Sequence, residues 1–268
     1  MTVHEVSVSS PPTRRVEEAV RVLENAASKG VVLRLLGGMA FYLRCPSARS
    51  GILARSYIDV DFIGHARQSS DIKRLFGELG YAPRERFNAI HGSRRLGFMG
   101  SGQQERVDVF LDVFEMCHRF DLKVRMEIDS QTIPLADLLA TKLQIIQTNE
   151  KDFGDMVCLL LDHEVGDTDL RDVVNGEYLA RLCSEDWGIY KTFTMKLAML
   201  GVVVESWDLK QPEKELVAKR IGKLSAAIEE APKSLAWRMR AALGERVRWY
   251  ELPEEDARQV EQVQATES

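Results

Sequence analysis

The chain has 268 residues, enough to bury a core in one large domain or two modest ones. Hydrophobic residues make up 45% and charged residues 29%, which excludes a disordered chain and is typical of a soluble globular protein. The formal net charge of −5 argues against a general nucleic-acid coat protein. No apolar run approaches the roughly 20 residues that span a bilayer, and the N-terminus lacks the apolar stretch of a signal peptide. We therefore expect a cytoplasmic protein without a membrane partner.

The N-terminal part of the chain alternates helix and strand patterns. Residues 1–12 are predicted to form a flexible arm. The elements expected after it are an amphipathic helix over 13–30, a strand over 31–36, a short helix after Gly37-Gly38, a strand over 56–64, a helix over 70–80, a hairpin of 94–100 with 105–114, a strand over 122–128, and helices beginning at Pro134 and near Asp152. This order predicts a mixed α/β region.

The pattern becomes purely helical from about residue 166. Helices are expected over 167–174, 184–200, 215–230 and 234–243. We therefore predict one domain over 13–165, with its core at 30–165, and a helical C-terminal domain over 166–268. The four cysteines are far apart in the sequence and form no CxxC pair, so free thiols are expected rather than disulfides or zinc ligands.

Two features near the first strands carry a chemical signal. Gly37-Gly38 lies between a predicted strand and a helix, where glycines let backbone N–H groups approach an anion. Asp59 and Asp61 alternate with apolar residues, so both carboxylates are expected on one face of a strand. A divalent cation would relieve their repulsion, and Mg²⁺ prefers carboxylates together with phosphate oxygens. The alternative is a solvent-exposed strand face with two solvated carboxylates.

A third carboxylate is expected from a later strand. Asp108 and Asp112 both lie in the run VDVFLD, and alternation places them on the same face. Only the end of the strand nearest the metal can contribute a ligand, and the sequence leaves open which of the two does so. A phosphate cradle beside paired carboxylates predicts phosphoryl or nucleotidyl transfer.

The ordered motifs GGMA (37–40), RSYIDVDF (55–62) and VDVF (107–110) resemble the nucleotidyltransferase fold of the DNA polymerase beta superfamily. LLATKLQ (138–144) and KDFGDMVCLL (151–160) extend the resemblance to the AbiEii-type nucleotidyltransferases, which include toxins of type IV toxin–antitoxin systems. The resemblance covers roughly residues 30–165. It implies an α/β (α+β) fold with a small mixed sheet flanked by helices, followed by a helical C-terminal domain.

The resemblance also implies roles for single residues. Asp59, Asp61 and Asp108 would be catalytic and would bind Mg²⁺ or Mn²⁺. The remaining implied residues are Gly37, Gly38, Arg55 and Ser56 for the nucleotide, Lys142 for its phosphates, and Asp152 or Asp155 for orienting the lysine or deprotonating the acceptor. The chain departs from the family pattern at Met39, where a hydroxyl residue is usual.

Three of these residues can also be interpreted from their own positions in the sequence, without the family resemblance. Lys142 falls within the apolar stripe of its predicted helix, so it needs an anionic partner or must extend its ammonium group to solvent. Asp152 can equally cap the helix that follows it. Arg55 can contact phosphate or form a surface salt bridge.

The leading interpretation is a Mg²⁺-dependent nucleotidyltransferase that transfers a nucleoside monophosphate from an NTP to an acceptor hydroxyl. The acceptor would be a tRNA or other RNA 3′ end, a protein or a small molecule, and a toxin would require an antitoxin partner. The alternatives are a non-catalytic nucleotide-binding or protein-interaction module and an antibiotic nucleotidyltransferase. Basic and aromatic residues interleave over 233–250, which is compatible with RNA binding or with a solvated helix anchored by buried aromatic rings.

Overall fold

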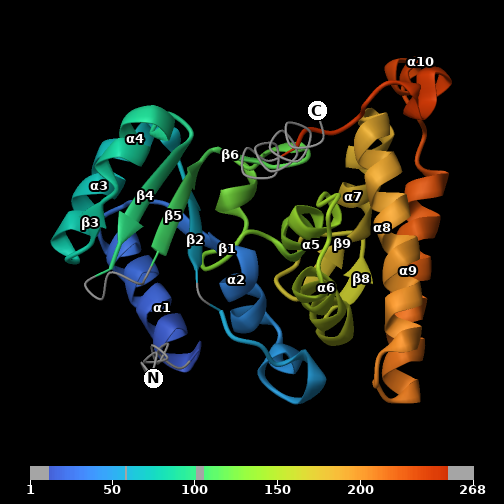
Figure 1. Ribbon diagram of the computed structural model, residues 1–268, viewed down its shortest axis with the longest axis horizontal. Coiled ribbons are helices and arrows are strands. Elements are labelled where there is room, and N and C mark those ends of the chain that lie inside the picture. Colours follow the sequence, from blue (N-terminus) through green and yellow to red (C-terminus); the bar gives the residue numbers. More distant parts are fainter. Residues whose placement is uncertain (1–11, 58, 101–105, 253–268) are drawn as a thin grey trace, which may run out of the picture.

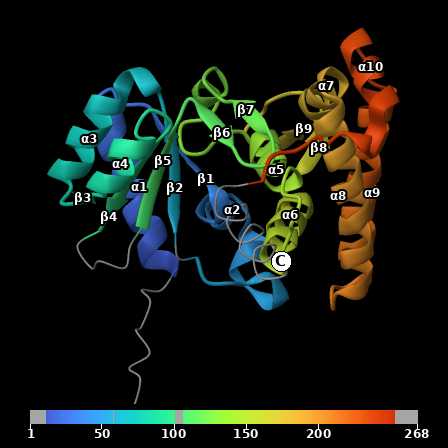
Figure 2. The ribbon, with the colours of Figure 1, turned by 45° about the horizontal axis from the view of Figure 1, so that its top comes forward.

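The computed structural model describes residues 12–57, 59–100 and 106–252. The predicted N-terminal arm, apart from its last residue, the residues 101–105 around the turn of the predicted hairpin and the C-terminal tail lie outside the described residues. A sheet with its helices forms one end of the molecule, two long helices form the other, and α2, α5 and α6 lie between them (Figures 1 and 2). No helix within the described ranges is long and apolar enough to cross a membrane.

A five-stranded mixed sheet has the strand order β1-β2-β5-β4-β3. The central pair β2 and β5 is parallel, and every other neighbouring pair is antiparallel. The strands are β1 (Leu33–Leu36), β2 (Val60–Gly64), β3 (Ala82–Pro83), β4 (Arg95–Met99) and β5 (Arg106–Leu111). The predicted hairpin is confirmed as β4 and β5, whereas the predicted strand over 56–64 begins only at Val60 and leaves Asp59 outside it.

One face of the sheet is the apolar core of this end of the molecule. Phe62 of β2 and Phe98 of β4 both contact Phe76, with ring centroids 6.0 and 4.4 Å apart. These residues alternate with Asp61 and Gly97, so the polar residues of the same strands occupy the opposite face. The covering helices are α1 (Pro12–Ser28), which carries an apolar face as predicted, and α3 (Ser69–Glu78). Helix α4 (Glu85–His91), which the sequence analysis did not predict, packs beside β4.

The second half of the chain is mostly helical, as predicted. The α-helices described there are α7 (Gly176–Glu185), the two long helices α8 (Trp187–Ser206) and α9 (Gln211–Glu230), and α10 (Leu235–Leu243). They follow α2 (Gly37–Arg44), α5 (Leu135–Leu143) and α6 (Glu150–Asp162) in the chain, and α7 and α8 pack against α5. All four cysteines are buried and free, as the sequence predicted.

Two predicted elements are wrong. Residues 122–128 form a loop with a single turn of 3₁₀ helix rather than a strand, because Leu122 and Met126 are buried while Val124 is 77% exposed. This spacing of four residues suits a helical turn and not an alternating strand. The short strands in this region are β6 (Val113–Glu115) and β7 (Arg119–Asp121).

Residues 167–174 are also not a helix. Strand β9 (Val173–Asn175) pairs in parallel with β8 (Glu164–Gly166), and Asn175 then caps α7 through the backbone N–H of Tyr178. The upstream Asp169 accepts two hydrogen bonds from Arg125, at 2.6 and 2.8 Å, so its loop is tied to the 3₁₀ turn that follows β7. The guanidinium of Arg125 also lies 3.8 Å from the ring centroid of Tyr178.

Candidate functional site

The register of β2 and β5 places Asp61 directly opposite Asp108. Paired residues on adjacent strands share a face, so both carboxylates lie on the polar side of the sheet. Asp108 is buried, Asp61 is partly buried and Asp59, just before β2, is exposed. The structure therefore brings two of the three predicted carboxylates together on regular strands, and the third precedes them on a connecting segment.

Asp112 is not part of this group. It follows β5 at the other end of the parallel pair, with φ of 60°, and its carboxylate lies 3.2 Å from Nδ1 of His65. The register therefore selects Asp108 over Asp112 as the neighbour of Asp61, the point that the alternation in the sequence left open.

Gly37 begins α2 at the place where the helix meets the Asp61 carboxylate. Its φ of +66° is in the region that favours glycine, and a Cβ atom added there would lie 2.5 Å from Oδ2 of Asp61. A Cβ atom on Gly38 would lie 2.5 Å from Nη2 of Arg55 and 2.8 Å from Cδ1 of Tyr57. Both glycines are therefore needed for close approach, the first by a carboxylate and the second by a cation stacked on an aromatic ring.

Asp61 carries an unfavourable negative charge. Its burial, reinforced by the nearby charges of Asp108 and Asp59, raises its pKa to about 7, against the smaller opposing effects of Arg95 and Lys142. A carboxyl group of this kind is protonated over much of the range in which an ordinary aspartate is ionised. A bound cation would remove this penalty.

Asp108 is held by two arginines that the sequence analysis did not assign to the site. Nη1 of Arg84 donates to Oδ1 of Asp108 at 3.3 Å, and Nη2 of Arg95 donates to Oδ2 at 2.8 Å. Arg84 precedes α4, whereas Arg95 begins β4. Arg95 and Gly97 alternate onto the face of Asp108, so a signal was present in the hairpin sequence, but its use depends on the strand register.

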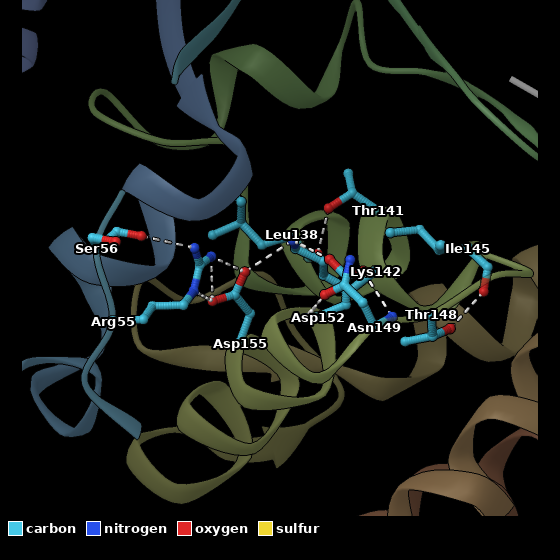
Figure 3. Close-up of polar contacts among 10 residues, drawn as sticks. All are labelled: Arg55, Ser56, Leu138, Thr141, Lys142, Ile145, Thr148, Asn149, Asp152 and Asp155. Atoms are coloured by element: carbon cyan, nitrogen blue, oxygen red, sulfur yellow. Dashed lines mark hydrogen bonds and ion pairs between the residues drawn. The ribbon is translucent and has the colours of Figure 1, made fainter. Parts of the chain in front are cut away.

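A second cluster of charges lies between α5, α6 and the segment before β2 (Figure 3). Nζ of Lys142 lies 2.8 Å from Oδ1 of Asp152 and 2.9 Å from Oδ2 of Asp155. Burial alone lowers the pKa of Lys142, but the charges of Asp155 and Asp152 outweigh it, so the net direction is upward. Of the two alternatives that the sequence left for Lys142, an anionic partner or extension to solvent, the structure shows the first.

Arg55 belongs to the same cluster. Its Nη2 contacts both carboxylate oxygens of Asp155, at 2.8 and 2.7 Å, and its guanidinium lies 3.9 Å from the ring centroid of Tyr57. Asp155 is buried and thus bridges Arg55 to Lys142. Ser56 is exposed, and its carbonyl oxygen accepts a long contact of 3.5 Å from Arg55.

The carboxylate of Asp152 contacts Lys142, whereas the residue that caps α6 is Asn149 and not Asp152. The backbone N–H of Asp152 donates to the side chain of Asn149 at 3.1 Å, and Oδ2 of Asp152 accepts from the backbone N–H of Asn149 at 3.4 Å, which completes a capping box. A residue that the sequence analysis missed supports the same loop: the buried Lys196 of α8 donates from Nζ to the carbonyl of Ile146 at 2.7 Å. No local pattern predicts this contact, because the two residues are 50 positions apart.

Carboxylate oxygens such as those of these aspartates are the ligands that hard divalent cations prefer. Asp61 and Asp59 offer oxygen atoms that have no lysine or arginine within ion-pair distance among the described residues. As the side chains stand, no three histidine, cysteine or acidic residues of the described ranges are grouped to hold a metal. The oxygens of Asp108 are instead engaged by arginine. Asp59 and Asp61, with Asp108 once its arginines withdraw, are the residues that would hold the cation.

The chain is similar to known proteins only at the level of weakly matching solved structures. No model of a known family matches the chain, and no curated protein sequence matches it. Among solved structures, the lincosamide antibiotic adenylyltransferase LnuA with bound lincomycin is 12% identical, covers 52% of this chain and 92% of its own, and has a TM-score of 0.34. The antibiotic-resistance factor ANT(2'')-Ia is 13% identical, covers 88% of this chain and 97% of its own, and has a TM-score of 0.33.

The basic and aromatic residues near the C-terminus pack on one another. The ring centroids of Tyr190 and Trp237 are 5.1 Å apart, and Nζ of Lys233 lies 5.2 Å from the centroid of Tyr190. Trp187 similarly contacts both Trp249 and the guanidinium of Arg240. These contacts favour the interpretation of the aromatic residues as structural anchors over that of a preformed base-stacking surface.

Proposed function

We propose that the protein is a divalent-metal-dependent nucleotidyltransferase that transfers a nucleoside monophosphate from an NTP to an acceptor hydroxyl and releases pyrophosphate. The observation that carries this proposal is the pairing of Asp61 with Asp108 on adjacent parallel strands, with Gly37 at the start of α2 against the Asp61 carboxylate. The sequence resemblance to AbiEii-type nucleotidyltransferases supports the same activity. A divalent cation at Asp59, Asp61 and Asp108 would offset charge on the phosphates and lower the pKa of the acceptor hydroxyl.

The second cluster fixes two cations, Lys142 and Arg55. Asp155 holds Lys142 and Arg55 from one buried carboxylate, so both cations are fixed at the junction of α2, α5 and α6. Fixed cations of this kind favour a bound phosphate without reorganising during the reaction. Asp152 adds a second contact that orients Lys142 and ties it to the first turn of α6. We assign Lys142 to phosphate binding and the two aspartates to its orientation.

The test is transfer from each labelled NTP in the presence of Mg²⁺, with total RNA, purified tRNA, protein extract and small-molecule hydroxyl compounds as acceptors. We expect one acceptor class to be labelled by the wild type and not by Asp61→Asn. Asp71→Asn is a matched control, because Asp71 is a surface carboxylate that pairs with Arg74. Equal labelling by wild type and Asp61→Asn across all acceptors would overturn the proposed activity.

For the finer assignment we propose an RNA acceptor, with the 3′ end of tRNA as the first candidate, and a toxin controlled by an antitoxin. This part rests on the resemblance in the sequence. It predicts that expression of the wild type arrests growth of a bacterial host and that Asp61→Asn does not. Growth arrest by both variants, or by neither, contradicts the toxin assignment and leaves the transferase activity to be decided by labelling.

A further inference from the structure

The contact between Asp108 and Arg84 depends on the missing side chain at Gly97 of strand β4. Gly97 is the direct neighbour of Asp108 in the sheet, and a Cβ atom there would lie 3.1 Å from both Cδ and Nη1 of Arg84. Arg84 therefore crosses β4 over the one position at which no side chain obstructs it. The side chain of Asn88 bonds to both the N–H and the carbonyl of Gly97, which holds α4 and Arg84 in place.

The two arginines have more binding capacity than Asp108 uses. The Nε atom of Arg95 is buried and has no hydrogen-bond partner among the described residues. The side chains of Arg84 and Arg95 are 24% and 37% exposed, while that of Asp108 is only 5% exposed. Each guanidinium also lies against a ring, Arg84 4.3 Å from the centroid of Phe87 and Arg95 4.6 Å from that of Phe110. The cations are thus oriented, accessible and incompletely paired.

We propose that Arg84 and Arg95 bind the triphosphate chain of the NTP and that, in the free protein, Asp108 occupies them. This inference rests on the proposed function and adds two residues to it. It also adds an exchange of partners, in which the cation replaces the arginines on Asp108 and the phosphates replace Asp108 on the arginines. A cation that takes the oxygens of Asp108 competes directly with the arginines for the same atoms. Once released, two adjacent guanidinium groups on the polar face of the sheet need an anion, and phosphate oxygens match their paired N–H groups.

This exchange of partners couples the binding of the cation to the binding of the triphosphate. In the free site the two arginines engage both oxygens of Asp108, so a cation must displace them before it gains this ligand. A polyphosphate alone meets arginines that are already occupied. Cation and triphosphate therefore assist each other's binding, because each satisfies the groups that the other releases.

The experiment is calorimetric titration with inorganic tripolyphosphate in EDTA at fixed ionic strength, without metal. We expect Asp108→Asn, which removes the negative charge that holds both arginines, to bind about 10-fold more tightly than wild type, and Arg84→Gln/Arg95→Gln to bind about 10-fold more weakly. Asp59→Asn is the matched control, because it removes a neighbouring negative charge without releasing an arginine. Arg94→Gln removes an adjacent arginine that is 84% exposed and pairs with Glu115 instead.

Two results would overturn the inference: Asp108→Asn binding no more tightly than Asp59→Asn, or the double arginine variant binding as tightly as Arg94→Gln. If the double arginine variant does not fold, the comparison of Asp108→Asn with Asp59→Asn still decides. The outcomes for activity are separate. Transfer of NMP with unchanged tripolyphosphate binding in the double variant rejects the arginine site alone, whereas the expected affinities without any transfer reject the proposed activity alone.

Discussion

Replacing Gly37 by alanine tests whether the approach of α2 to Asp61 is a real constraint. The substitution has two costs: alanine at φ of +66°, and a Cβ atom 2.5 Å from Oδ2 of Asp61. The first is about 1–2 kcal/mol, partly offset by about 0.4–1 kcal/mol from the reduced freedom of the unfolded chain. The second adds about 1–3 kcal/mol, because the carboxylate must turn away from the helix.

Gly51 provides the matched control. Its φ is +65°, and a Cβ atom there would meet nothing within 4 Å, so Gly51→Ala has only the backbone cost. Urea denaturation followed by circular dichroism and by tryptophan fluorescence would give both free energies of unfolding and test two-state behaviour. We expect Gly37→Ala to be less stable than Gly51→Ala by about 1–3 kcal/mol and to bind Mn²⁺ more weakly. Equal stability of the two variants would show that the Asp61 carboxylate moves freely, which would refute the close-approach argument.

Three further predictions concern the charged groups. Asp155→Asn should lower the free energy of unfolding by about 3–5 kcal/mol, because it leaves two cations facing a buried neutral group; the exposed-pair control Arg74→Gln should change it by less than about 1 kcal/mol in the same urea assay. Lys196→Met should leave stability unchanged or raise it, since burial disfavours the ammonium, yet should speed amide hydrogen exchange at 145–149; unchanged exchange would contradict its anchoring role. The raised pKa of Asp61, about 7, means that proton and metal compete, so Mn²⁺ affinity should rise from pH 6 to pH 8 in wild type and stay flatter in Asp61→Asn.

The same raised pKa also predicts the direction of the pH effect on stability. The folded state holds a proton on Asp61 up to about pH 7, whereas the unfolded chain releases it near the ordinary value for aspartate. Between those limits the folded state binds more protons, so this residue lowers the free energy of unfolding as pH rises, and the loss is complete above pH 7. In metal-free buffer, Asp61→Asn should therefore gain stability relative to wild type from pH 4 to pH 7. A constant difference over that range would mean that the carboxylate is not desolvated.

Short-range patterns were sufficient for much of the fold and for part of the site. The alternation around Asp61 placed its carboxylate on a polar strand face, and the apolar stripe around Lys142 required an anionic partner or a path to solvent, because each signal lies within one strand or one helix. The strand predicted over 122–128 was wrong for a different reason: β-branched and apolar residues there are compatible with either period, and tertiary contacts selected a helical turn. Local propensity could not decide between them.

The arginines of the site were beyond sequence reasoning because their partners depend on register. Arg95 and Asp108 are 13 positions apart, across a turn whose length sets which residues face each other. Arg84 is further removed, since its path to Asp108 depends on the absence of a side chain at Gly97, which becomes meaningful only once β4 and α4 are placed. Pairing across strands therefore carries information that a single strand does not.

The distribution of counter-ions explains why the cation would bind at Asp61. Asp155 and Asp152 share Lys142, with Arg55 on the far side of Asp155, and Asp108 has Arg84 and Arg95. Asp61 has no such partner among the described residues, although it is partly buried and faces Asp108. If its carboxylate were merely structural, the substitution Asp61→Asn would raise the free energy of unfolding without any loss of Mn²⁺ binding, because it removes a carboxylate without a counter-ion at nearly constant volume. A variant that gains stability but loses Mn²⁺ binding would identify Asp61 as a residue kept for its ligand rather than for the fold.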